Sequence, residues 1–146
     1  MRTVPASPSH IVPLLARCDP GDLLLVNARS AWGAVIETMV LLRGSVLTWC
    51  GLDDAGPVIV GGVIPQADGG GYVWQVAAPV LASHKRAYLL QGRALLTEAR
   101  GQFCVLATHI RVGFHAALRH ARRMGFMAVR EFDLVGARMC RLERGL

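Results

Sequence analysis

The spacing of hydrophobic and polar residues divides the first third of the chain into short apolar segments. Residues 9–17 predict a short helix that ends at the DPGD turn of residues 19–22. Two apolar runs follow, at residues 23–28 and 30–43, and runs of this length fit a helix and a buried strand equally well. Over residues 31–42 we favour a helix.

The middle of the chain has the short β-branched runs that are typical of strands. SVLTWCGL (45–52) and PVIVGGVIP (57–65) flank the turn DDAG (53–56), and this arrangement predicts a β-hairpin. After a glycine-rich turn, YVWQVAAP (72–79) predicts a third strand that Pro79 closes. Three antiparallel strands in succession are therefore expected.

Helical and extended segments alternate in the second half of the chain. Ser83 is a good N-cap for a helix that runs to about Ala99 and is stopped by Gly101. Further segments predict a strand at 102–109, a helix at 113–124, and strands at 127–134 and 137–144. This order predicts one α/β domain over residues 1–146, with a mixed sheet of about six or seven strands covered by three or four helices.

The overall composition is apolar for a chain of this length. Hydrophobic residues make up 53% and charged residues 18% of the 146 residues, which excludes a disordered tail and favours a partner over part of the apolar surface. The longest apolar stretch offers about 12 residues where a membrane-spanning helix needs roughly 20. With no secretory signal visible at the N-terminus, we expect no membrane span and a cytoplasmic origin.

The formal net charge is +6, and Lys85 is the single lysine among 16 basic residues. On a helix over residues 113–124, the basic side chains gather within about 100° of one another, opposite an apolar face. Two interpretations are open: a solvated surface, or a surface that contacts nucleic acid or an acidic protein. The side chains of this predicted basic face are His115, Arg119, Arg122 and Arg123.

Residues able to perform chemistry are scattered along the sequence. Cys104 and His109 are five positions apart on a predicted strand, so they point to opposite faces and form no nucleophile–base pair. The four cysteines lack metal-ligand spacing, so we expect free thiols and no metal. A general base could come from one of four carboxylates, which fit an exposed surface equally well: Glu37, Glu98, Glu131 and Asp133.

The order of elements resembles the GNAT superfamily of acyl-CoA N-acyltransferases. More narrowly, residues 48–133 resemble a podophage family known as internal virion protein A, whose members carry a GNAT-like domain. The matching segments are CGLDDAGPVIVGG, YVWQVAAP, SHKR and ALRHARRMGF, in this order. Since the sheet of GNAT-like folds opens beside the aromatic strand, the resemblance implies a choice between core packing and partner binding for Trp74.

Two departures from the GNAT pattern concern catalysis and the cofactor. The tyrosine that serves as general acid in GNAT enzymes is replaced by Ala121, and a methyl group donates no proton. The glycines that let a helix start approach the acyl-CoA pyrophosphate are also missing, because Gly92 falls well inside the predicted helix. A weaker anion site remains at the basic helix start, formed by Ser83, His84, Lys85 and Arg86.

Three functions follow from the resemblance and the charge. The first is a catalytically inactive phage protein without a cofactor, acting in the virion or its assembly through contacts with other virion proteins. The alternative is an N-acetyltransferase that uses acetyl-CoA to modify a host or phage protein. The third is a DNA-contacting protein of the capsid interior. The expected location is the virion or the host cytoplasm.

Overall fold

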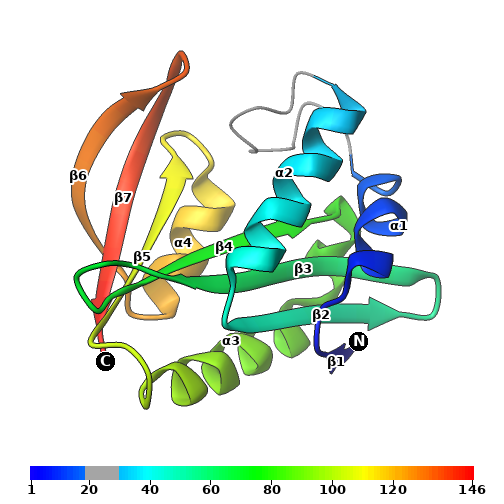
Figure 1. Ribbon diagram of the computed structural model, residues 1–146, viewed down its shortest axis with the longest axis horizontal. Helices are drawn as coiled ribbons and strands as arrows, with labels where there is room; N and C mark the ends of the chain where they lie inside the picture. Colours follow the sequence, from blue (N-terminus) through cyan, green and yellow to red (C-terminus); the bar gives the residue numbers. More distant parts are fainter. Residues whose placement is uncertain (19–29) are drawn as a thin grey trace.

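A single mixed sheet of seven strands organises the part of the chain that the computed structural model describes, residues 1–18 and 30–146 (Figure 1). Its spatial order is β1-β2-β3-β4-β5-β7-β6, and every neighbouring pair is antiparallel except β4 and β5. The predicted mixed α/β sheet is confirmed; residues 23–28 lie outside the described residues. The strands are β1 (Arg2–Val4), β2 (Leu47–Asp53), β3 (Gly56–Pro65), β4 (Gly71–Ala77), β5 (Val105–Arg111), β6 (Met127–Leu134) and β7 (Ala137–Gly145).

Helices cover both faces of this sheet. In Figure 1, α2 (Ala31–Gly44) lies across the front of the sheet beside α1 (Ile11–Leu15), which follows the 3-10 turn η1 (Pro8–His10). The helix favoured for residues 31–42 is confirmed, and the Ser30 hydroxyl caps it by accepting from the Gly33 N–H. The opposite face carries α3 (Lys85–Ala99), which continues the 3-10 segment η3 (Pro79–His84), and α4 (His115–Arg123).

Two separate apolar cores hold these layers together. Between the sheet and α1–α2, residues such as Ile11, Leu14 and Val60 are fully buried. Between the sheet and α3–α4, the core is built around Leu106 and Leu142. Alternate residues of β2, β3 and β4 therefore point to different cores, as strands covered on both faces require. No helix among the described residues is long and apolar enough to cross a membrane.

The sheet opens between β4 and β5, and this opening positions the candidate site. The two strands pair only at Gly71 with Leu106 and at Tyr72 with Ala107. On its other side β4 stays paired with β3 along its whole length, through Ala77. From Val73 onward, the edge of β4 that faces β5 therefore has no strand partner, and its backbone N–H and C=O groups are available to a ligand.

Gly125 ends α4 in a left-handed conformation, with φ of 86°. Its N–H donates to the Arg122 carbonyl, and the Phe126 N–H donates to the Ala121 carbonyl. These two bonds form a Schellman motif, which requires a residue at positive φ after the helix. The Gly-Phe pair thus turns the chain sharply into β6 and buries the Phe126 ring in the core.

We expect Gly125→Val to destabilise the protein by about 1–3 kcal/mol, because a β-branched residue is strained at positive φ. A Cβ at this position would also lie 3.1 Å from Arg144 Nη1. Thermal or urea unfolding measures the change. Gly125→Asn is the matched control, since asparagine tolerates this region, and equal losses in the two variants would contradict the conformational explanation.

Candidate active site

His109 and Tyr72 face each other where β4 and β5 separate. Their rings have centroids 5.1 Å apart, and on the other side of His109 the Phe132 ring lies at 4.9 Å. The His109 Nε2 atom is buried and has no hydrogen-bond partner. A buried ring nitrogen without a partner carries a desolvation cost, which a bound ligand able to donate a proton would relieve.

The surroundings fix the protonation states of both side chains. Burial, followed by the positive charges of Arg141 and Arg130, lowers the pKa of His109 from its ordinary 6.5. Burial and the negative charge of Glu37 on α2 raise the pKa of Tyr72. At neutral pH the site therefore holds a neutral imidazole, which can accept a proton, beside a protonated phenol, which can donate a hydrogen bond.

A second polar group lies on the α3–α4 side of the same opening. Gln75 of β4 donates an amide hydrogen bond to the Tyr88 hydroxyl of α3, and the Tyr88 ring stacks on His120 of α4 at 4.0 Å between centroids. Burial raises the pKa of Tyr88 to about 12. One turn along α3, Gln91 is buried with both side-chain polar atoms unpartnered. Hydrogen-bonding groups thus occur on both sides of the opening.

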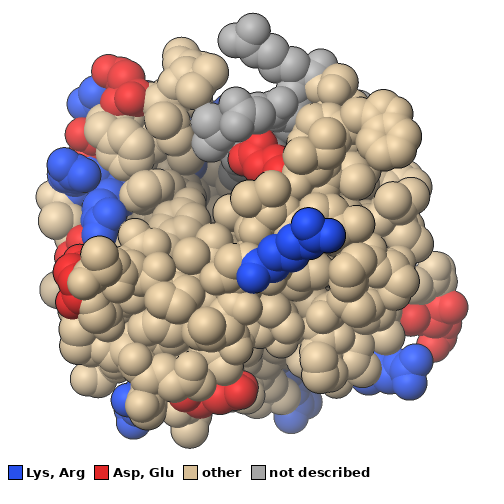
Figure 2. Space-filling model, viewed as in Figure 1, with Lys and Arg blue, Asp and Glu red and all other residues tan. Residues whose placement is uncertain are grey.

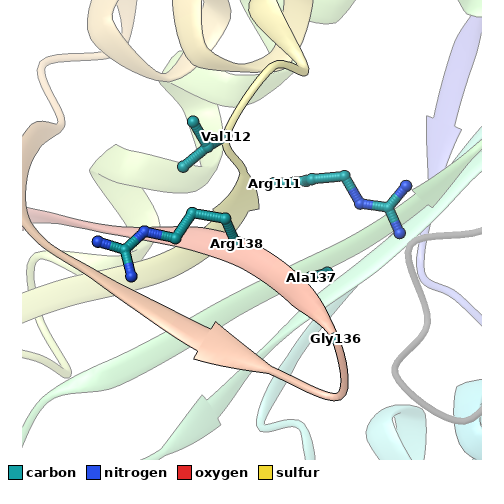
Figure 3. Close-up of a pocket in the computed structure, with 5 residues that line it drawn as sticks. All are labelled: Arg111, Val112, Gly136, Ala137 and Arg138. Carbon is teal, nitrogen blue, oxygen red and sulfur yellow. The ribbon is translucent and has the colours of Figure 1, made fainter.

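A shallow hollow of about 490 Å³ lies at the carboxyl end of β5, against the β6–β7 turn. In Figure 3, Arg111 and Arg138 extend from this hollow in opposite directions. Arg138 contacts two carboxylates of β6, Glu131 and Asp133, at 3.2 Å each. These two acids are exposed and paired with a cation, which makes them poor general bases; Glu98 is exposed on α3.

Figure 2 shows one basic side chain lying across the middle of the face that carries α2, with most other charged side chains toward the edges of this face. Trp32, Ile36 and Val40 lie four residues apart on α2, and each is at least 60% exposed. Residues four apart share one side of a helix. An apolar stripe is therefore exposed on the face of the sheet to which His109 and Tyr72 point.

The predicted N-cap of α3 requires correction, whereas the anion site at this helix start stays a prediction. His84 rather than Ser83 is the N-cap, and it makes no side-chain capping bond. The Ser83 hydroxyl donates to the Val80 carbonyl inside η3. The His84 ring lies 3.7 Å from Asp53, whose pKa is held well below its usual range by Arg17. Of the four predicted residues, Lys85 and Arg86 remain exposed cations.

The basic face predicted on α4 is exposed as expected. Its four side chains point away from both cores, and none forms an ion pair within the described part of the chain: His115, Arg119, Arg122 and Arg123. Trp74 belongs to a different environment. It is 5% exposed, and its indole N–H donates to the Ser45 hydroxyl at 2.8 Å. Of the two roles that the sequence left open for Trp74, burial of its ring in the α1–α2 core favours packing over partner contact.

Sequence reasoning missed His109, Tyr72 and Tyr88. His109 was considered only with Cys104, which precedes β5 and bonds to the Gly69 carbonyl. The signal lay in the alternation along β5, which places His109 on the opposite side from the core residues Leu106 and Ile110. The partner across the gap comes from a strand more than thirty residues earlier, so local spacing could not reveal it.

Solved structures with the same architecture are acetyltransferases. An N-acetyltransferase from Staphylococcus aureus Mu50 superposes with a TM-score of 0.76 at 9% identity, covering 99% of this chain and 97% of that one. A ribosomal-protein-alanine N-acetyltransferase from Brucella melitensis gives 0.73 at 14% identity over 100% of both chains. An aminoglycoside acetyltransferase in complex with coenzyme A and kanamycin gives 0.73 at 11% identity, covering 98% and 93%.

The chain has the GNAT fold. This confirms the GNAT-like mixed sheet predicted from the order of elements. No family model matches the sequence, and no curated protein matches it. The resemblance to phage internal virion proteins therefore stays a prediction, whereas the fold is shared with the acetyltransferases above.

Proposed function

We propose that the protein is an N-acyltransferase that moves an acyl group from a pantetheine thioester to a primary amine. The observation that carries this proposal is the neutral, unpartnered imidazole of His109 at the point where β4 and β5 diverge. The fold is that of acetyltransferases, and one structure of similar shape holds coenzyme A. Acyl transfer is the alternative function predicted from the sequence, and the inactive virion protein becomes the second candidate.

The opening fits the amide-bearing arm of such a donor. The free edge of β4 from Val73 offers backbone N–H and C=O groups that can pair with an extended chain, as in the addition of a strand. Gln75 and the unpartnered amide of Gln91 lie on the α3 side of this edge. The thioester supplies an activated acyl carbon next to a sulfur leaving group.

The acceptor amine approaches from the face that carries α2. An amine that is cationic in water is attracted by the Glu37 carboxylate, whose charge acts on Tyr72. His109 Nε2 first removes the proton that makes the amine cationic, which frees the nitrogen lone pair to form the new C–N bond. As the C–S bond breaks, the acylated nitrogen loses its second proton to solvent. Because its lowered pKa keeps His109 neutral, the base is ready at physiological pH.

The leaving sulfur requires a proton donor in place of the tyrosine that Ala121 replaces. The Tyr88 hydroxyl stands at the β4 edge, held by the hydrogen bond from Gln75. That bond uses an oxygen lone pair and leaves the phenolic hydrogen free to donate to the departing thiolate. Tyr88, on α3, therefore acts as the general acid that the GNAT pattern places on α4.

Release of free thiol tests the proposed function. The protein is mixed with a panel of primary amines and one of three acetyl donors: acetyl-CoA, acetyl-phosphopantetheine, or an acetylated acyl carrier protein. We expect thiol release that depends on the amine with at least one donor, and mass spectrometry should find the acetylated amine. Absence of amine-dependent release with all three donors would overturn the proposal.

A non-catalytic role in a virion is the second candidate, favoured by Ala121 and by the exposed cations of α4. It predicts no thiol release with any donor. It also predicts that reversing the charge of Arg119 and Arg122 removes the protein from purified particles while its thermal stability is unchanged. Both results together would favour this second candidate over acyl transfer.

A further inference from the structure

The segment that leads from β4 into α3 has no glycine before Gly92 that could let the backbone approach the diphosphate of coenzyme A. Pro79, the first residue of η3, has no N–H, and the Leu81 N–H already donates to the Ala78 carbonyl. Gly92, the one glycine of α3, serves helix packing instead. A Cβ there would lie 2.9 Å from Met124 Cε of α4. The pantetheine arm of a donor can therefore pair with the free edge of β4. The nucleotide part of coenzyme A has no comparable glycine-lined site for its diphosphate.

The two helices beside the opening run parallel, with their starts at the same end. Tyr88 and Gly92 of α3 contact His120 and Met124 of α4, so contacts advance along both helices together. Lys85 thus lies one turn before Tyr88, toward the start of α4. Both helix starts lie at the carboxyl ends of β4 and β5, where the sheet is open.

Unpaired positive charge lies at the start of α3 and along the exposed side of α4, from its first to its last turn. Arg119 and Arg123 lie on one side of His120 on the surface of α4, and burial together with the charge of Arg123 lowers the pKa of His120. None of the exposed cations of α3 or α4 pairs with a carboxylate in residues 1–18 and 30–146. A basic surface of this kind is complementary to an acidic partner. We call these exposed side chains the mouth surface; it begins at the two helix starts and continues to the end of α4, and its members are Lys85, Arg86, His115, Arg119, Arg122 and Arg123.

We propose that the acyl donor is carried by a protein: a small acidic carrier whose phosphopantetheine arm enters the β4–β5 opening while its body docks on the mouth surface. This inference rests on the proposed acyl transfer. The arm of such a carrier has a single phosphate and no nucleotide, so it does not require the missing glycine cradle. Contacts between the basic mouth surface and the acidic carrier provide the binding energy that a diphosphate site would otherwise provide for free coenzyme A.

Binding of three donor forms tests the inference by calorimetry at low salt: acetyl-CoA, acetyl-phosphopantetheine and an acidic bacterial-type acyl carrier protein bearing acetyl-phosphopantetheine. We expect the loaded carrier to bind at least about 10-fold more tightly than acetyl-CoA, and its affinity to fall as salt rises. Arg119→Glu/Arg122→Glu should weaken carrier binding by about 10-fold or more and leave acetyl-phosphopantetheine binding within about 2-fold. The control Arg43→Glu/Arg100→Glu makes the same charge change at helix ends away from the mouth surface and should change neither.

Several outcomes would overturn the inference. One is tighter binding of acetyl-CoA than of the loaded carrier, or equal loss of carrier affinity in both double variants. Another is salt-sensitive binding of duplex DNA through Arg119 and Arg122 with no response to the carrier. These results leave acyl transfer intact if acetyl-CoA supports amine-dependent thiol release. Failure of all three donors in that assay is instead the failure of the proposed function.

Discussion

His109→Gln is expected to lower kcat/KM for amine acylation by about 10²–10⁴-fold, the usual contribution of a general base. Glutamine keeps a polar side chain beside Tyr72 and Phe132 but cannot take a proton at neutral pH. Thiol release under first-order conditions measures the loss. The circular dichroism spectrum should be unchanged, which separates lost chemistry from lost folding.

The pH profile provides a readout that a purely structural role would not change. A general base works when it is neutral, so activity is full above its pKa and declines as the pH falls through it. Because the pKa of His109 is lowered from 6.5, the acidic limb of the wild-type profile should lie below pH 6.5, and it should vanish in His109→Gln. An unchanged limb in the variant would assign the base to another residue.

Gly61→Ala is expected to destabilise the fold by about 3 kcal/mol, at the upper end of the usual cost of overpacking. A Cβ on Gly61 would lie 2.4 Å from Trp49 Cζ2 and 2.8 Å from the Trp74 carbonyl oxygen. The carbonyl cannot move away without disturbing the pairing of β3 with β4. The melting temperature should fall by roughly 6–12 °C for a domain of this size.

Gly101→Ala is the matched control for this variant. A Cβ on Gly101 meets no atom within 4 Å, and its φ is not positive. We expect a change of less than about 0.5 kcal/mol, typical of exposed positions. Similar melting temperatures for the two variants would show that β2 and β3 separate easily to accept a methyl group, which contradicts the tight packing of Trp49.

The sequence alone determined the elements and their order, because these depend on local patterns. The β-branched runs predicted the β2–β3 hairpin, and the helix predicted over residues 113–124 matches α4, which ends before Gly125. The strongly basic side of α4 also followed from helical spacing. The short strand β1 was missed, since its three residues carry too little pattern.

The tertiary structure decided which side chains meet, and therefore the chemistry. Whether Trp74 packs in the core or contacts a partner depended on α2 lying over its strand face, where Ser45 accepts its N–H. His109 became a candidate base only when β5 was placed beside β4, because Tyr72 and the charges that lower the pKa of His109 come from distant parts of the chain. Local propensity fixes hydrogen bonds between near neighbours, whereas burial and electrostatics at a site are set by residues brought together only by the folded sheet.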